Sequence, residues 1–153
     1  MHHFKEKRNQ RADSEQFATF HVGDLFFGIP AVHVQEVIRQ QEMTPIPLSS
    51  SAVKGFINLR GQIVTAIDAR TALDLQPGPE APPMNIIIGS EDGAVSLLVD
   101  GIGDVLEVQQ TSFAPIPENV PEAQRRMITG VFKLRDRLML WLDTERLLEA
   151  AFQ

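Results

Sequence analysis

An internal repeat constrains the fold of this chain more than any other feature of its sequence. The segment VKGFINLRGQIVTAIDARTAL, which begins at Val53, aligns without a gap on ITGVFKLRDRLMLWLDTERLL, which begins at Ile128. The identical pairs are Gly55 and Gly130, Leu59 and Leu134, Arg60 and Arg135, Asp68 and Asp143, and Leu73 and Leu148. Nearly all apolar positions between them match in kind. One structural unit is therefore written twice, which predicts two like lobes packed together.

The repeat continues upstream with a slightly shorter offset. Residues 44–47 (TPIP) align on residues 114–117 (APIP), and Ile29 and Val32 align on Val99 and Ile102. The two offsets differ because the loop after the second Pro-Ile-Pro contains an insertion. Each half is expected to run strand, strand, Pro-x-Pro connection, hairpin and short helix.

Short β-rich runs with period-two patterns predict the strands. They cover residues 17–22, 25–29, 57–67 with a break, 84–88, 95–99 and 138–142. Turn signals bound them at residues 23–24, 89–93 and 101–103. Many short strands indicate a mainly β, barrel-type fold.

The stretch GFINLRGQIVTAID, residues 55–68, predicts a hairpin with Arg60 at its tip. Ile57, Leu59, Ile63 and Ile67 share one parity of the strand, and Arg60 has the other, so its side chain points away from these apolar neighbours. Gly61 suits a left-handed turn, and the second copy has Asp136 there, a residue type that also tolerates this backbone.

Asp68 and Asp143 each end a strand and precede a short helical pattern, at residues 69–75 and 144–152. An aspartate in this position accepts hydrogen bonds from free backbone N–H groups of the first helical turn. Their duplication fits a capping role better than catalysis.

Composition limits the classes of function. The chain has 153 residues, enough for one globular unit, with no cysteine and a net charge of −6. Residues 1–11 hold four basic residues against one acid, +3, and the remainder carries −9, which disfavours binding to nucleic acid. The chain has no apolar run long enough to span a bilayer, so we expect a cytoplasmic protein without membrane insertion.

No motif points to catalysis, a metal or a cofactor. The four histidines lack the spacing of a metal site, and Gly101-Ile102-Gly103 is interpreted as a turn because Leu106 replaces the third glycine of a dinucleotide fingerprint. The carboxylate pairs Glu91 with Asp92 and Asp104 with Glu107 are interpreted as solvated surface charge. A hydrolase with scattered carboxylates stays open as an alternative class.

Two segments place a charge beside apolar residues: Val34-Gln35-Glu36-Val37 and Asn58-Leu59-Arg60-Gly61. The pattern is typical of a contact surface. The alternative is that Glu36 and Arg60 are unrelated solvated charges.

Over about residues 15–150 the chain resembles the CheW-like family of chemotaxis coupling proteins. The resemblance is carried by Phe20, Phe27, Val34, Glu36, Val37, Pro45, Pro47, Val53, Gly55, the Asn58-Leu59-Arg60-Gly61 hairpin, Asp68, Val99, Asp100, Val105, Pro115, Pro117 and Gly130. The polar residues 1–14 are expected to form a disordered tail. The resemblance implies a CheW-like domain at residues 15–153. That domain would be two interleaved, SH3-like β-barrel lobes of about five strands each, related by a pseudo-twofold axis, with short helices.

The resemblance also implies a function. The chain would be a non-enzymatic adaptor at membrane-associated receptor arrays, binding the regulatory domain of the histidine kinase CheA and the cytoplasmic tip of methyl-accepting chemotaxis receptors. The residues it places at the receptor groove are Val34, Glu36, Val37, Asn58 and Arg60, with Glu36 and Arg60 orienting one another. It does not place the kinase-binding surface.

This chain departs from the family pattern after the hairpin, where Thr65 and Ala66 replace the usual proline and β-branched residue and Ala69 replaces leucine. These departures affect packing and not the groove. The polar N-terminal extension and the particular receptor-facing residues leave the pathway open. A scaffold of twitching motility or of another non-flagellar receptor pathway is the alternative. A small-barrel nucleic-acid-binding module is the alternative from a different class.

Overall fold

The fold is described from a computed structural model of the chain. It describes residues 14–39, 41–46, 51–76, 78, 83–90 and 93–152. The predicted N-terminal tail lies outside the described residues except for Ser14, with which the first strand begins. Pro47 of the first Pro-Ile-Pro, together with Glu91 and Asp92, also lies outside them.

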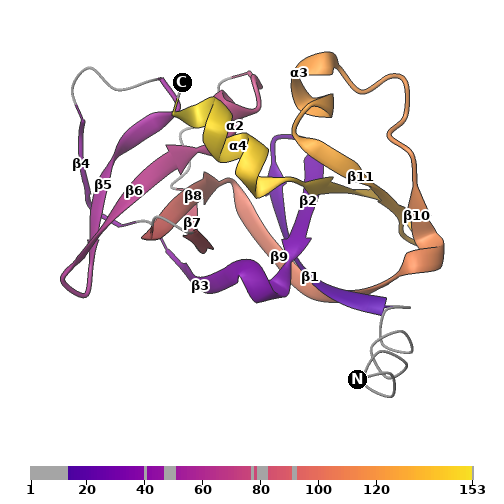
Figure 1. The fold of residues 1–153 in the computed structure, drawn as a ribbon, viewed down its shortest axis with the longest axis horizontal. Helices are drawn as coiled ribbons and strands as arrows, with labels where there is room; N and C mark the ends of the chain where they lie inside the picture. The colour runs from indigo at the N-terminus through magenta and orange to yellow at the C-terminus, as the bar shows by residue number, and fades with distance from the viewer. Residues whose placement is uncertain are drawn as a thin grey trace, which may run out of the picture.

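The chain forms two six-stranded sheets with few helices, which confirms the prediction of a mainly β fold (Figure 1). In the first sheet the strand order is β10-β11-β12-β2-β1-β9, and in the second it is β3-β7-β8-β6-β5-β4. The strands of the first sheet are β1 (Ser14–Val22), β2 (Leu25–Pro30), β9 (Gly101–Gln109), β10 (Phe113–Ala114), β11 (Ile128–Lys133) and β12 (Leu138–Leu142). Those of the second are β3 (Val34–Ile38), β4 (Met43–Thr44), β5 (Val53–Leu59), β6 (Gln62–Asp68), β7 (Met84–Ser90) and β8 (Gly93–Val99).

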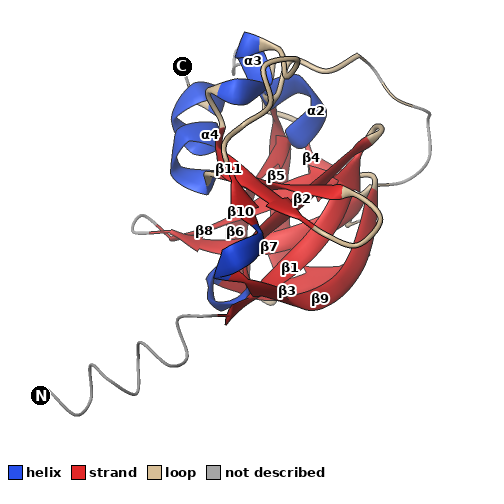
Figure 2. Cartoon of the chain, turned by 90° about the vertical axis from the view of Figure 1, so that its right-hand side faces the viewer, coloured by secondary structure: helices blue, strands red, loops and turns tan. Residues whose placement is uncertain are grey.

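Within the described ranges, three short α-helices lie on one side of the sheets, and a 3₁₀ turn that leads into β3 lies on the opposite side (Figure 2). The helices are α2 (Ala69–Ala72), α3 (Glu122–Arg125) and α4 (Thr144–Ala151). The 3₁₀ turns are η1 (Ala31–His33) and η2 (Gln110–Ser112).

The repeat in the sequence reappears as a repeat in the topology. Written from β10 and from β4, the two strand orders become β10-β11-β12-β2-β1-β9 and β4-β5-β6-β8-β7-β3. Each strand of the second sheet then has a counterpart in the first. Strand β4 corresponds to β10 and β5 to β11, with the same two offsets that the sequence alignment has in these regions.

Parallel strand pairs interleave the two halves of the chain. Strand β12 pairs with β2, with Leu140 opposite Phe27, and β6 pairs with β8, with Thr65 opposite Val95. The N-terminal hairpin thus completes the sheet of the C-terminal hairpin. Neither half can form its sheet alone.

The strand count and the sheet closure differ from the predicted barrels. Each sheet has six strands, because the Pro-x-Pro connections contribute the two-residue strands β4 and β10. Within the described residues, β9 and β10, the end strands of the first sheet, do not pair with each other, nor do β3 and β4 in the second. Closed SH3-like barrels are therefore not confirmed.

The main core lies between the two sheets and contains residues from both. Phe20 and Phe27 of the first sheet and Ile67 and Leu97 of the second are at most 1% exposed, and Leu147 of α4 packs with them. A second, largely aromatic cluster is formed by strands of the first sheet. In it Phe17, Phe26, Phe132 and Met139 pack together with Trp141.

Gly101 to Gly103, predicted as a turn, instead begin the long strand β9, so that interpretation is wrong. The chain bends one residue earlier, at Asp100. Gly103 lies against β1, where a Cβ atom would be 2.4 Å from the Thr19 Oγ1 atom. The glycine allows a close approach of two strands here.

The first hairpin has the predicted tight turn, and the second does not. Arg60 and Gly61 have φ of 53° and 85°, and they link the paired residues Leu59 and Gln62, as in a two-residue turn. Asp136 is not among the described residues with positive φ, so its predicted left-handed conformation is wrong. The second hairpin uses a wider loop, residues 134–137, between β11 and β12.

Both predicted helix caps are confirmed. The Asp68 carboxylate accepts a 3.1 Å hydrogen bond from the Arg70 N–H, and Asp143 accepts one of 3.2 Å from the Arg146 N–H. Helix α2 is shorter than predicted and ends at Ala72, whereas α4 extends to Ala151.

Candidate functional site

The side chains of Glu36 and Arg60 meet in a two-pronged ion pair. The Arg60 Nη1 atom donates to the Glu36 Oε1 atom at 3.0 Å, and Nη2 donates to Oε2. A guanidinium and a carboxylate joined by two parallel hydrogen bonds hold each other in a fixed orientation. The pairing predicted for these two residues is thus present in the structure.

The local fold brings the pair together from distant parts of the second sheet. Glu36 lies on β3, an end strand whose register against β7 shifts between Val34 and Glu36. Arg60 lies at the tip of the β5–β6 hairpin, where the Asn58 Oδ1 atom accepts a 2.9 Å hydrogen bond from the Gly61 N–H. Three strands separate β3 from β5 in the sheet order, so the sheet must curl for the two side chains to touch.

The ion pair is largely at the surface. The Arg60 side chain is 70% exposed and the Glu36 side chain 27% exposed. The hydrogen bond from Arg60 holds the pKa of the Glu36 carboxyl below its ordinary value, and the bond to Glu36 raises the pKa of Arg60. Because water screens an exposed pair, its main effect is to orient the guanidinium rather than to stabilise the fold.

The other predicted site residues lie close in sequence to this pair, but they do not share one face. Asn58 is exposed and holds the turn that carries Arg60. Along β3, Val34 and Glu36 are half-buried and Val37 is 41% exposed, in alternation. Val37 therefore points to the opposite side of the strand from Glu36.

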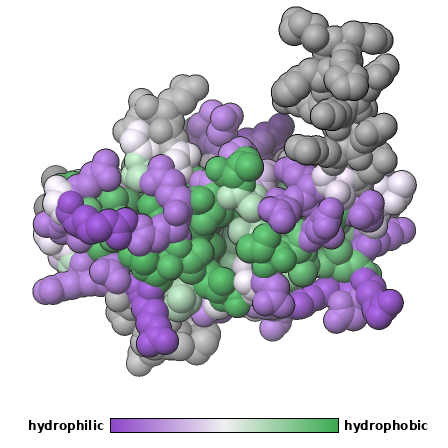
Figure 3. Space-filling model, turned by 90° about the horizontal axis from the view of Figure 1, so that it is seen from below, coloured by the Kyte–Doolittle hydropathy of each residue, from purple (hydrophilic) through white to green (hydrophobic). Residues whose placement is uncertain are grey.

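Sequence reasoning missed several exposed apolar side chains near these elements. Val32 in η1 is 88% exposed, Ile63 opposite Asn58 in the hairpin is 62% exposed, and Val105 on β9 is 60% exposed. Figure 3 shows apolar surface in the middle of the lower face, flanked by polar residues. The parity of the hairpin could have identified Phe56, which is 39% exposed on the same strand face as Asn58.

The described part of the chain contains neither a candidate metal site nor a candidate membrane-spanning helix. Among those residues no group of three His, Cys, Asp or Glu side chains could hold a metal ion. No helix within the described ranges is long and apolar enough to span a membrane.

The chain is similar to chemotaxis proteins from several bacteria. It is 31% identical over 138 residues to a chemotaxis protein CheW of Klebsiella aerogenes, covering 89% of this chain and 82% of that protein. It is 30% identical over 142 residues to a probable chemotaxis protein CheW of Rhizobium etli, covering 92% and 91%.

Similarity to a solved structure supports the fold. The crystal structure of the scaffolding protein TtCheW from Thermoanaerobacter tengcongensis superposes with a TM-score of 0.76 at 23% identity, covering 84% of this chain and 88% of that one. The model of the CheW-like domain matches residues 16–152. This match extends over nearly the whole chain, and the chain therefore belongs to the CheW-like domain family.

Proposed function

We propose that this chain is a non-enzymatic adaptor that couples chemoreceptors to the histidine kinase CheA in bacterial chemotaxis. The observation that carries the proposal is the Glu36–Arg60 pair, formed by the Asn-Leu-Arg-Gly hairpin and β3 of a CheW-like chain. The names of the relatives, chemotaxis proteins CheW, support this role. The adaptor would act in the cytoplasm, at membrane-associated receptor arrays.

The binding mode proposed for the receptor is a helical hairpin laid in a groove. Such complexes use apolar anchors for affinity and charged groups for orientation. Arg60, held by Glu36 and 70% exposed, would fix the register of the helix through a carboxylate or carbonyl oxygen. Val34 and Asn58 would supply the neighbouring contacts, and Val37 would supply a contact from the other side of β3.

The proposal includes the finer description of the fold, two barrel-like lobes related by a pseudo-twofold axis. Two observations support it. The strand orders of the sheets correspond position by position. The contact between Glu36 and Arg60 bridges separated strands, as in a sheet that curls toward closure.

The test is a reconstitution of the receptor tip, CheA and this protein, with kinase autophosphorylation as the readout. Stimulation only when all three components are present supports the adaptor function. The same rate of autophosphorylation with and without this chain contradicts it.

A further inference from the structure

The main chain passes from the second sheet to the first at Asp100, between β8 and β9. The Asp100 N–H donates a 3.0 Å hydrogen bond to the His21 carbonyl of β1. The Asp100 Oδ2 atom accepts a 2.7 Å hydrogen bond from the Gly23 N–H in the turn between β1 and β2. Asp100 therefore attaches the crossing to the N-terminal hairpin of the first sheet.

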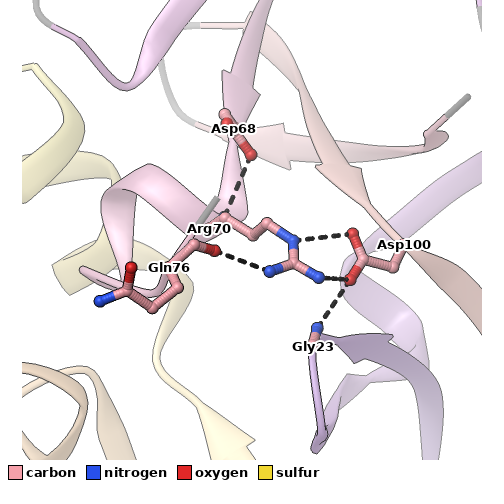
Figure 4. A network of polar contacts seen from close by, with 5 residues as sticks. All are labelled: Gly23, Asp68, Arg70, Gln76 and Asp100. Carbon is pink, nitrogen blue, oxygen red and sulfur yellow. Dashed lines mark hydrogen bonds and ion pairs between the residues drawn. The ribbon is translucent and has the colours of Figure 1, made fainter. Parts of the chain in front are cut away.

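Arg70 attaches the same carboxylate to the second sheet (Figure 4). It belongs to α2, which follows β6 directly. Its Nε and Nη2 atoms donate to the two oxygens of Asp100 at 3.2 and 2.5 Å, and Nη1 donates to the Gln76 carbonyl at 2.7 Å. The chain of contacts from α2 through Asp100 to Gly23 thus connects the two sheets.

The guanidinium sits in a closely fitting site. The Arg70 side chain is 16% exposed and that of Asp100 36% exposed. A Cβ atom on Gly78 would lie 2.2 Å from the Arg70 Cζ atom, so a larger residue there would displace the guanidinium. Burial raises the pKa of the Asp100 carboxyl, but the hydrogen bonds from Arg70 and Gly23 outweigh burial and keep this pKa below its ordinary value.

The second crossing between the sheets is built differently. It runs from β2 through η1 to β3 and contains Pro30, which aligns on Asp100 in the sequence repeat. Proline has neither a backbone N–H nor a polar side chain with which to make such a clamp. The polar contacts of Asp100 thus lie at the crossing from β8 to β9, beside the helices. The elements η1 and β3 lie on the opposite side (Figures 1 and 2).

We infer that Arg70 and Asp100 are positioning residues that fix the orientation of the two sheets and so shape the partner-binding face. Neither residue needs to touch the partner. The ion pair of Glu36 and Arg60 belongs to the second sheet, and the exposed Val105 belongs to the first. The affinity of a partner that contacts both sheets therefore depends on the angle between the sheets. This last step rests on the proposed function.

Distance measurement by pulsed electron spin resonance tests the inference directly. The chain has no cysteine, so spin labels can be placed at Lys133→Cys in β11 and Thr44→Cys in β4, both exposed positions on different sheets. We expect a narrow distance distribution in the parent and a broader one in Arg70→Ala and in Asp100→Asn. An unchanged width in both variants, with the fold intact by circular dichroism, overturns the inference.

Arg146→Ala is the matched control. Arg146 also pairs with an aspartate at the start of a helix, Asp143 at 3.4 Å, and it donates a 3.3 Å hydrogen bond to the Arg126 carbonyl, but neither contact reaches a strand of the second sheet. The distance distribution of Arg146→Ala should be as narrow as that of the parent. If it is as broad as that of Arg70→Ala, the specific role of Arg70 is overturned. Should Arg70→Ala not fold, Arg70→Lys replaces it, because lysine keeps the charge but lacks the fork that joins Asp100 and Gln76.

The binding arm uses a receptor-tip fragment with the same variants. Residues that act through a shared structural element change binding affinity by about twofold to thirtyfold, and we expect a loss within that range for Arg70→Ala and Asp100→Asn. Broadened distances with unchanged affinity overturn the link to binding. If the parent chain does not bind the fragment, the proposed function fails, while the distance measurement still decides the inference.

Discussion

Asp68 and Asp143 occupy the same position in the two halves of the molecule and share two contacts. Each carboxylate caps the helix that follows it. Each backbone N–H also donates to the carbonyl of an equivalent upstream residue, from Asp68 to Ala52 at 2.8 Å and from Asp143 to Met127 at 2.7 Å. The duplication therefore preserved a strand end, a helix start and the loop against which they pack.

Removing either cap should destabilise the fold by a similar amount. We expect Asp68→Ala and Asp143→Ala each to lower the free energy of unfolding by about 1 kcal/mol, because backbone N–H groups of the first helical turn lose their acceptor. Urea unfolding measures the change. Asparagine keeps an acceptor oxygen, so Asp68→Asn and Asp143→Asn are the controls. If the asparagine variants lose as much stability as the alanine variants, capping is not the main role of these residues.

The repeated glycines Gly55 and Gly130 should differ in their tolerance of alanine. A Cβ atom on Gly55 would lie 2.4 Å from the Thr44 carbonyl oxygen, which belongs to the backbone and cannot move aside. On Gly130 it would lie 2.4 Å from the ring of Phe113, a side chain that is 46% exposed and can rotate away.

We therefore expect Gly55→Ala to cost roughly 1–3 kcal/mol, the usual range for overpacking, and Gly130→Ala to cost less. The midpoints of urea unfolding compare the two variants. Equal losses of stability would show that the contact with the Thr44 backbone does not restrict the size of the residue at position 55.

The ion pair of Glu36 and Arg60 should be visible in a pH titration. Since Arg60 depresses the pKa of the Glu36 carboxyl in the folded chain, the contribution of the pair to stability is present above the pKa of the unfolded state and is lost as pH falls through the folded value. We expect the Glu36 carboxyl, followed by NMR, to titrate below the ordinary 4.5, and Arg60→Gln to move it back upward. The same titration in both proteins would mean that the pair does not persist in solution.

Local sequence patterns were enough to predict several elements. A short continuous run of apolar residues predicted the bounds of β12, 138–142, and the alternation of residues 57–67 placed Arg60 on the outer side of a hairpin tip. The aspartate before each helical pattern predicted both caps. These features depend on residues that are neighbours in the chain.

The features that were missed depend on distant parts of the chain. Strand β9 mixes glycines and charges, GIGDVLEVQ, and becomes a strand because it pairs along β1, which lies at the far N-terminal end of the domain. The parallel pair of β2 and β12 joins the two ends of the chain and leaves no local pattern. Asp136 was expected to copy Gly61, but the wider loop of the second hairpin removes the need for a left-handed residue.

For the candidate site, the sequence predicted the contact of Glu36 with Arg60 but not the directions of the other side chains. Val37 was grouped with Glu36, yet the alternation of β3 points it to the other side of the strand. The exposed Val32 was not identified, because a 3₁₀ turn between two strands has no periodic pattern.

The central claim is that Arg60, oriented by Glu36, grips a receptor helix. Its most direct test is the affinity of a receptor-tip fragment for Arg60→Glu, compared with Arg135→Glu. Arg135 is the repeat counterpart of Arg60, exposed on the hairpin of the other sheet, so the control carries the same charge change at the matching position. We predict that Arg60→Glu abolishes binding while its thermal transition stays close to that of the parent, and that Arg135→Glu binds normally. Full binding by Arg60→Glu, or equal losses in both variants, would contradict the assignment.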